Sequence, residues 1–259
     1  MTDALLLEGL QYAEQNFLDE QADHLKVDKR LVRKLLNLDG KRIMDFGCGM
    51  GGMTLWYAKN WDCEVFGTDI DGHHIEVANR IKEKYRLSNV VFSQQNVIEQ
   101  PLDEKFDYIF LNDVVEHISL DYLDNIFAQL KKALKPDGRI FISYPPWKSP
   151  YASHLNHVIK IPWCQFLPKK MLDTLIEKHN HPIVGELESD LREAYDGLNK
   201  MTHHKLMGVA ERSGLTLVYR KSHCIINNLP ILENVPFRIF PFDYLITKEF
   251  LMLSNNKMI

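Results

Sequence analysis

The residues with the clearest chemical potential lie between Lys41 and Gly52, in the segment KRIMDFGCGMGG. A short apolar run that contains Ile43 and Met44 is broken by closely spaced glycines, and an apolar stretch, 53–58, follows. Glycines permit positive φ and let a ligand approach the main chain without a Cβ in the way. The helix expected after them offers free N–H groups and the positive end of its dipole. This strand, turn and helix predict a binding site for a polar, partly anionic ligand.

Two classes of cofactor fit such a turn. Gly47, Gly49 and Gly52 satisfy G-x-G-x-x-G, the dinucleotide-binding fingerprint. Asp69 follows after about 20 residues, the spacing of a ribose ligand in that fingerprint. Asp45, two residues before the first glycine, favours a different ligand, because a carboxylate at the entrance of the turn repels a pyrophosphate and attracts an ammonium group. S-adenosylmethionine carries an ammonium group together with a carboxylate, a sulfonium and a ribose.

The segment from Asp45 to Gly51 resembles the first motif of the class I S-adenosylmethionine-dependent methyltransferases, which has the form acidic-x-G-x-G-x-G. Asp45, Gly47, Gly49 and Gly51 match its fixed positions, and Phe46 stands between the acid and the first glycine. The resemblance implies that these residues hold S-adenosyl-L-methionine, the cofactor of that family. A nicotinamide-dependent oxidoreductase, a non-catalytic protein that keeps the fold, and a glycine turn without a ligand are the alternatives.

Positions after the turn complete the implied cofactor site. Asp69 ends the second expected strand, 63–69, where its carboxylate suits the two ribose hydroxyls, and Ile70 beside it would pack on the adenine. Asn96 and Val97 follow the third expected strand. There the family commonly has an acid that accepts a hydrogen bond from the adenine amino group. An amide oxygen can also accept this bond, and a turn-forming asparagine is the alternative interpretation.

The fourth expected strand, 106–111, continues into the segment from Asn112 to Ile118 (NDVVEHI). This segment resembles the fourth motif of many small-molecule methyltransferases, including its Glu-His pair. Asn112 is a predicted cofactor contact, and His117, just past the strand on the cofactor side, is a candidate base. Enzymes that methylate exocyclic amino groups of bases carry Asn/Asp-Pro-Pro-Tyr after the fourth strand. The double proline here, 145–146, follows the fifth strand, so this subclass is not expected.

The alternation of expected strands and helices stops at residues 146–200, where aromatic residues, prolines, histidines and lysines are mixed. An insertion of this length is usually functional, and it leaves the carboxyl end of the fifth strand, beside the crevice where open α/β sheets bind ligands. We expect an acceptor cap in which His154 and His157 are candidate bases, with Tyr144 as an orienting group. Because no third ligand accompanies the two histidines at a suitable spacing, no metal site is expected. The apolar-basic run 158–170 indicates a substrate gate or, alternatively, a membrane-surface contact.

The resemblance implies an α/β, Rossmann-like fold that positions these cofactor and cap residues. It consists of a seven-stranded, mostly parallel sheet with an antiparallel last strand, helices on both faces and an inserted cap. Residues 135–138 (KPDG) are expected to form the turn between a helix and the fifth strand. The N-terminal helical region either lies over the cofactor or packs on the sheet edge. We expect four parts: an N-terminal helical segment 1–40, an S-adenosylmethionine-binding core 41–145, an inserted substrate cap 146–200 and the C-terminal part of the core 201–259.

Composition and net charge restrict the partners and the cellular location that are expected for this chain. A net charge of −4 gives no general attraction to nucleic acid, and four scattered cysteines favour reduced thiols in a cytoplasmic protein. No signal peptide is expected, because the sequence begins without a basic n-region and a cleavage site. No stable membrane insertion is expected, because no apolar run reaches about 18 residues. The sequence therefore predicts methyl transfer to a small-molecule acceptor, favouring a hydroxyl oxygen because candidate bases are present. A saccharide or lipid-linked acceptor is the alternative, and the identity of the acceptor and the oligomeric state are left open.

Overall fold

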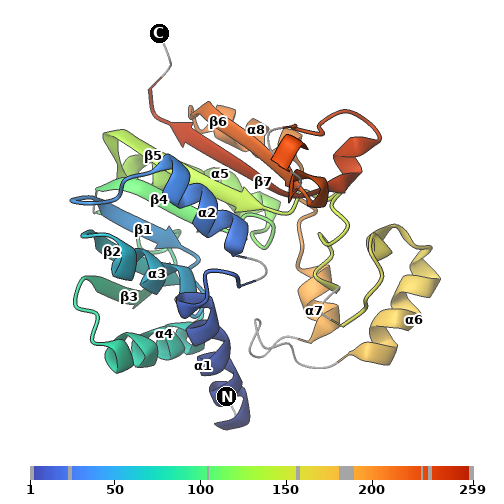
Figure 1. Cartoon of the computed structure of the whole chain (residues 1–259), viewed down its shortest axis with the longest axis horizontal. Helices are drawn as coiled ribbons and strands as arrows, with labels where there is room; N and C mark the ends of the chain where they lie inside the picture. Colours follow the sequence, from blue (N-terminus) through green and yellow to red (C-terminus); the bar gives the residue numbers. More distant parts are fainter. Residues whose placement is uncertain are drawn as a thin grey trace. The chain divides into compact units, whose positions relative to one another are not determined.

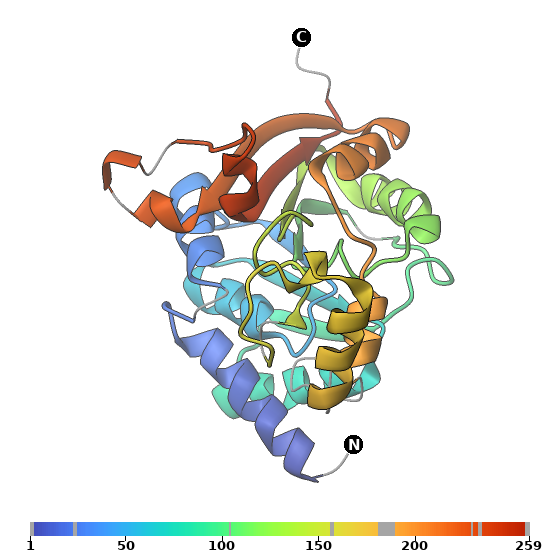
Figure 2. The same ribbon diagram turned by 90° about the vertical axis from the view of Figure 1, so that its right-hand side faces the viewer.

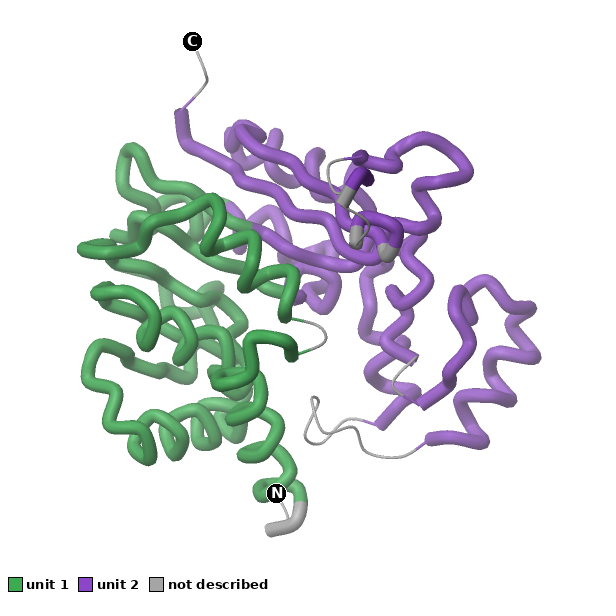
Figure 3. Tube along the Cα trace, in the orientation of Figure 1, with its two compact units in different colours: residues 1–112, 128–141 green, residues 113–127, 142–259 purple. Residues whose placement is uncertain are grey.

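The computed structural model describes residues 3–22, 25–103, 105–155, 158–180, 190–228, 230–232 and 235–256. The chain divides into two compact units, which Figure 3 shows in different colours. The first unit comprises residues 1–112 and 128–141, and the second comprises residues 113–127 and 142–259. The division into four parts that the sequence suggests remains a prediction.

The sheet has seven strands in the order β3-β2-β1-β4-β5-β7-β6, with helices around it, and β6 and β7 pair antiparallel. The predicted fold class is therefore confirmed, including the insertion of the last strand between the fifth and sixth. In chain order the strands are β1 (Arg42–Phe46), β2 (Glu64–Asp69), β3 (Val90–Gln94), β4 (Phe106–Asn112), β5 (Leu134–Tyr144), β6 (Thr216–Cys224) and β7 (Ile246–Ser254).

In the first unit, β1 pairs in parallel with both β2 and β4, and β2 pairs in parallel with β3. Asp45 is in register with Gly67 on one side and with Phe110 on the other. Parallel strands in register end at the same edge of the sheet, so this pairing brings the end of β1 close to Asp69 and Asn112. The helices of this unit are α1 (Asp3–Leu18), α2 (Lys26–Leu35), α3 (Gly52–Asn60) and α4 (Gly72–Tyr85) (Figure 1).

The helical region at the N-terminus consists of α1 and α2, and α1 packs against α3 and α4. The contact with α3 is close: a Cβ at Gly52 would lie 2.6 Å from Cβ of Asn16 and 3.3 Å from the carbonyl oxygen of Ala13. Gly52 is thus needed for helix packing at the first turn of α3. Among the described residues, no helix is both long enough and apolar enough to cross a membrane.

One expectation about a boundary was wrong. α5 (Leu120–Ala133) leads directly into β5 at Leu134, so the KPDG segment expected as a turn lies within the strand. A Cβ at Gly138 would lie 2.9 Å from the carbonyl oxygen of Phe106, and Lys135 forms an ion pair with Asp107. A Cβ at Gly138 would also lie 3.0 Å from the carbonyl oxygen of Lys135, so the chain bends within the first residues of β5. The strand thus begins before the bend and not after it.

The second unit contains the rest of the chain, with α6 (Lys169–His179), α7 (Leu191–Asp196), α8 (His203–Arg212), β6 and β7. α6 and α7 both lie within the 146–200 segment. The described part of the 146–200 segment has an apolar core of its own, because α6 and α7 pack against the loop that precedes α6 (Figure 2). The buried residues of this core are Leu155, Ile159, Cys164, Leu172, Ile176 and Leu191.

Candidate active site

The first turn has the backbone conformation that its glycines allow. Gly47, Gly49 and Gly51 have φ angles of 67°, 50° and 79°, in the left-handed region. A Cβ on Gly51 would lie 2.8 Å from both Cβ of Ala78 and Cζ of Phe92, whereas a Cβ on Gly49 would meet nothing within 4 Å. Gly51 is therefore required by packing. At Gly49 the main chain borders open space, as expected where a ligand approaches the backbone.

Asp45, on β1 before the turn, is a buried carboxyl group with 2% of its surface exposed. Thr54 Oγ1 donates to its Oδ2 over 2.6 Å, and Asn112 Nδ2 lies 3.3 Å from its Oδ1. Burial raises the pKa of Asp45 to about 7; the two hydrogen bonds oppose this effect and the charge of Asp69 adds to it. A nearby cation would favour the ionised form, so this group can respond to an ammonium ligand.

Asp69, at the end of β2, accepts hydrogen bonds from two backbone amides. Gly49 N donates to its Oδ2 over 2.8 Å, and Asp71 N donates to its Oδ1 over 2.9 Å. His74 Nδ1 lies 3.6 Å from the same Oδ1. Burial acts to raise the pKa of Asp69, but the contact with His74 and the backbone bonds outweigh it and hold the pKa below its ordinary value. Asp69 is therefore an anion at neutral pH.

The residues predicted to surround the adenine differ in their exposure. Ile70 is 72% exposed, so its apolar side chain is available to a planar ligand. Val97 is buried. Asn96 forms a turn, because its Oδ1 accepts from the amide of Ile98 over 3.1 Å and its Nδ2 donates to Glu99 over 3.0 Å. This geometry matches the turn interpretation of Asn96, and a contact of its amide with adenine remains a prediction.

Asn112, the last residue of β4, links the ends of two neighbouring strands. Besides its contact with Asp45, its Nδ2 lies 3.1 Å from the hydroxyl of Tyr57, whose buried ring stacks on Phe110 with centroids 4.5 Å apart. Phe46, the residue that follows Asp45, is also buried. Two hydrogen-bonded sets of predicted cofactor residues thus lie at the ends of these strands, Asp45 with Asn112 and Gly49 with Asp69.

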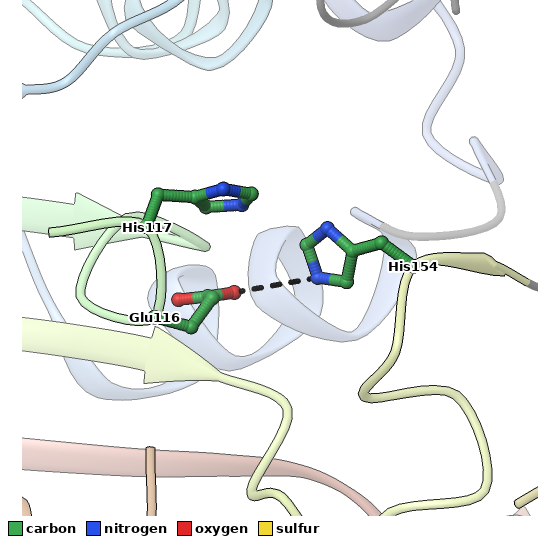
Figure 4. A group of neighbouring side chains, drawn as sticks. All are labelled: Glu116, His117 and His154. Carbon is green, nitrogen blue, oxygen red and sulfur yellow. Dashed lines mark ion pairs between the residues drawn. The ribbon is translucent and has the colours of Figure 1, made fainter. Parts of the chain in front are cut away.

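A second polar group lies in the second unit. Glu116 and His117 occupy the turn that follows β4, and His154 comes from the loop after β5. His154 Nε2 is 3.8 Å from Glu116 Oε1, and the rings of His117 and His154 meet edge to face with centroids 4.8 Å apart (Figure 4). The structure therefore brings together two of the predicted bases and adds Glu116, which sequence reasoning had not selected. The third candidate, His157, lies outside the described residues.

Tyr144 is fully buried at the end of β5. Its hydroxyl donates to Glu249 Oε2 over 2.6 Å, and Glu249 also accepts from Arg220 Nε over 2.6 Å and lies 3.2 Å from His203 Nδ1. Burial, together with the negative charge of Glu249, raises the pKa of Tyr144 well above its ordinary value. Tyr144 is thus a neutral hydrogen-bond donor within a buried network. Its predicted role toward an acceptor is a separate matter and stays a prediction.

The first-unit group suits S-adenosylmethionine. Open space borders the backbone at Gly49, Asp69 supplies an anion for ribose hydroxyls, and Ile70 presents an exposed apolar side chain. Asp45 can ionise beside an ammonium group, and the N-terminal turn of α3 follows the glycines. These residues fit the ammonium, carboxylate and adenosyl parts of that cofactor.

Residues 37–184 match the family model described as "Methyltransferase domain". The cyclopropane-fatty-acyl-phospholipid synthase of Escherichia coli (strain K12) is 31% identical over 119 residues, which cover 46% of this chain and 30% of that protein. The phosphoethanolamine N-methyltransferase of Plasmodium falciparum (isolate 3D7) is 25% identical over 121 residues, covering 46% of this chain and 44% of that protein. The chain thus spans less than half the length of these curated relatives.

Among solved structures, geranyl diphosphate C-methyltransferase from Streptomyces coelicolor A3(2), in complex with Mg²⁺, geranyl diphosphate and S-adenosyl-L-homocysteine, has the same fold. Its TM-score is 0.58 at 14% identity, over 89% of this chain and 80% of that chain. The sheet order and the glycine turn thus define a class I methyltransferase fold. The chain belongs to the methyltransferase-domain family, whose cofactor is S-adenosylmethionine, and the oxidoreductase alternative is not supported.

Proposed function

We propose that this chain transfers a methyl group from S-adenosylmethionine to a hydroxyl oxygen of a small-molecule acceptor. The proposal depends above all on the first turn, where the open backbone at Gly49 lies directly beside the anionic Asp69. Asp69 would hold the ribose hydroxyls, Ile70 would cover one face of the adenine, and Asp45 would face the ammonium group. When bound, the cofactor supplies an activated methyl group on a positively charged sulfur.

For methyl transfer the protein mainly has to align the acceptor and exclude water, and such positioning contributes several kcal/mol. A hydroxyl acceptor has a further need, because its oxygen becomes a strong nucleophile only when its proton is removed. The Glu116, His117 and His154 group contains the types of side chain that assist this step. In particular, the carboxylate of Glu116 lies 3.8 Å from Nε2 of His154 and can orient that imidazole.

The proposed acceptor atom is oxygen, whereas the named relatives include an N-methyltransferase and a C-methyltransferase. An amine in its free-base form already has a lone pair for attack. A hydroxyl gains more from a neighbouring base, and the histidine-carboxylate group therefore supports oxygen as the acceptor atom. The candidate bases predicted from the sequence are His117, His154 and His157, with Tyr144 as an orienting group.

The test uses S-adenosylmethionine with a ¹³C-labelled methyl group and matched acceptors that differ only in a hydroxyl, amino or activated carbon centre. We expect the label to appear in the carbon NMR spectrum as a methoxy group. Label found solely on nitrogen or carbon would overturn the choice of oxygen. Calorimetric titration with S-adenosylhomocysteine and with NAD tests the cofactor separately, and we expect S-adenosylhomocysteine alone to bind.

A lipid-linked acceptor is a second candidate, and a group of exposed apolar side chains favours it. Phe240 is 75% exposed in the loop before β7, together with Ile239 and Phe242. Exposed Phe166 lies near the same loop, with its ring centroid 6.0 Å from that of Tyr244. Exposed apolar patches of this kind often mark interaction sites for apolar partners.

Vesicle flotation distinguishes this candidate from a freely diffusing acceptor. If the acceptor is lipid-linked, the wild-type protein should float with phosphatidylcholine vesicles. The Phe240→Ser variant should float less, and Leu7→Ser, at an exposed position on α1, should behave like wild type. Wild-type protein that stays entirely at the bottom of the gradient would remove the lipid-linked candidate.

A further inference from the structure

We propose that Glu116, His117 and His154 form a binding site for a divalent transition-metal ion in the second unit. One carboxylate oxygen and one imidazole nitrogen from each histidine all lie within 4.8 Å of one another (Figure 4). The three residues come from two segments that are 37 positions apart, the turn after β4 and the loop after β5. Within the described part of the chain, this is where such ligand atoms gather.

The types of ligand restrict the choice of metal. Two imidazoles and one carboxylate suit Zn²⁺, Fe²⁺, Co²⁺ or Mn²⁺, whereas Mg²⁺ prefers an all-oxygen set. Metal–ligand bonds of about 2.0–2.2 Å place neighbouring ligand atoms about 3–3.5 Å apart. The ligand atoms lie within 4.8 Å of one another, with 3.8 Å between Glu116 and His154, so the side chains must rotate to bring them about 0.5–1.5 Å closer when an ion binds.

The turn that carries Glu116 and His117 is held in place from its backbone. Asn199 Nδ2 donates to the carbonyl oxygens of Val115 and Ile118, each over 2.7 Å. The amide N–H of Asn199 also donates to the carbonyl oxygen of Glu116 over 2.9 Å. These bonds fix the residues on both sides of the two ligands, so the ligand positions exist before any ion arrives. Preorganised ligands are what a metal site needs from its surroundings.

His154 is held with similar firmness. Its neighbours Ser153 and Leu155 are fully buried, and Leu155 belongs to the apolar core of the 146–200 segment. His154 itself has a φ of 56°, in the left-handed region of the backbone that residues other than glycine rarely adopt. Non-glycine residues in this conformation persist where the surrounding structure imposes it, and they often mark functional positions. The backbone therefore presents this imidazole to Glu116 at a cost in local strain.

The exposure of the ligands gives the site a closed side and an open side. Glu116 is 3% exposed, His154 is partly buried and His117 is exposed. A bound ion would have a buried anion on one side and room for exchangeable ligands on the other. Three protein ligands with open positions are the arrangement of catalytic metal sites, whereas structural sites are fully closed.

The role of the ion rests on the proposed function. An acceptor hydroxyl bound to the metal has a lowered pKa and loses its proton to solvent or to a base. The resulting oxygen forms the bond to the methyl carbon with its lone pair, while the electron pair of the carbon–sulfur bond stays on sulfur. The products are the methyl ether and the neutral thioether S-adenosylhomocysteine. In this role the histidines act as metal ligands. The bound ion lowers the pKa of the acceptor hydroxyl, so a weaker base is sufficient to remove its proton.

The test begins with the full chain treated with a chelator and then titrated with CoCl₂, ZnCl₂ and MgCl₂. We expect one Co²⁺ to bind per chain with visible absorption bands, Zn²⁺ to displace it, and Mg²⁺ to leave the bands unchanged. Glu116→Gln, His117→Ala and His154→Ala should each weaken Zn²⁺ binding at least about tenfold. The control is His204→Ala, which removes an exposed histidine on α8.

Two results would overturn the metal site: no Co²⁺ bands with the wild-type chain, or equal Zn²⁺ affinity for wild type and all three ligand variants. The wild-type spectrum decides the matter even if a variant fails to fold, which circular dichroism detects. Titration with S-adenosylhomocysteine separates this inference from the proposed function. Loss of metal binding with intact S-adenosylhomocysteine binding contradicts only the metal site, and the reverse result contradicts only the cofactor assignment.

Discussion

The amide of Gly49 donates a 2.8 Å hydrogen bond to Oδ2 of Asp69 and thereby joins the turn after β1 to the end of β2. Asp69 accordingly has two tasks, since it fixes the turn and provides an anion. We expect Asp69→Ala to weaken S-adenosylhomocysteine binding by about 1.5–3 kcal/mol, because bonds to a charged acceptor are lost. Isothermal calorimetry measures this change directly.

Asp69→Asn separates the two tasks because the amide oxygen can still accept from Gly49. We expect this variant to keep the folding stability of the wild type more closely than Asp69→Ala while losing most of the affinity. Glu64→Ala, at the exposed start of the same strand, is the matched control and should bind normally. Wild-type affinity in both Asp69 variants would show that this carboxylate does not contact the ligand.

Gly49 and Gly51 should respond differently to the same substitution. Gly49→Ala introduces a strained φ at a cost of about 1–2 kcal/mol, and its methyl group enters open space where the ligand is expected. Gly51→Ala adds a clash with Ala78 and Phe92, costing a further 1–3 kcal/mol or so. Thermal unfolding and S-adenosylhomocysteine titration should therefore show lost binding in a folded Gly49 variant and a larger loss of stability in the Gly51 variant. A Gly49 variant that binds normally would exclude the ligand from that space.

The affinity for S-adenosylhomocysteine should depend on pH through Asp45. Its pKa is about 7 without ligand, and an ammonium group nearby lowers the pKa because it favours the carboxylate. Binding below pH 7 therefore releases a proton, so affinity should increase with pH up to about 7 and then level off. Asp45→Asn should bind more weakly and lose this dependence. Calorimetry in buffers of different ionisation enthalpy counts the released proton, and no release at about pH 6 would contradict the assignment.

The same carboxyl group should affect folding stability in the ligand-free protein. Because the folded pKa of about 7 exceeds the unfolded value of about 3.9, the folded state binds more protons between these values. Stability from Asp45 is therefore complete below about pH 4 and is lost as the pH rises through 7, at up to about 1.4 kcal/mol per pH unit. Urea unfolding of wild type and Asp45→Asn across this range isolates the effect, since other groups titrate alike in both. Parallel pH profiles would mean that the buried carboxyl group is solvated in the folded state.

Tyr144→Phe tests whether Tyr144 serves the fold or the acceptor. Removing its hydroxyl leaves Glu249 with one fewer donor in a buried network, which should reduce the free energy of unfolding by about 1–3 kcal/mol. S-adenosylhomocysteine binding and KM for the acceptor should stay unchanged if Tyr144 is purely structural. A raised KM at unchanged stability would instead support the orienting role predicted from the sequence.

Most of the fold could be predicted because its signals are local. Glycine spacing marks the first turn, and apolar periodicity marks the helices and strands around it. The prediction was wrong at residues 135–138, where proline, aspartate and glycine are typical of a turn. There the segment belongs to β5, although the chain bends at Gly138, and it contacts β4 through the ion pair between Lys135 and Asp107 and the close approach of Gly138 to Phe106. Such contacts depend on a neighbouring strand and have no local signature.

The sequence predicted individual residues of the candidate site but not the contacts between them. His117 and His154 were each selected from their residue type and position, but nothing in the sequence indicates that their rings meet. Glu116 was seen as part of a motif and given no role, because its proximity to His154 arises from the path of the chain between them. The contact of His74 with Asp69 likewise has no signal in the sequence, because it is set by the start of α4.

The bonds from Asn199 to the turn at residues 115–118 also limit how this chain can be redesigned. Asn199 lies at the end of the 146–200 segment, so exchanging the whole segment for one from a relative would remove the bonds that hold the turn of Glu116 and His117. A chimera should therefore keep Asn199 together with Lys205, whose Nζ donates to the carbonyl oxygen of Asn199 over 3.0 Å. Grafts that end before residue 199 preserve this anchor, and grafts that replace it would release the turn that carries two of the candidate metal ligands.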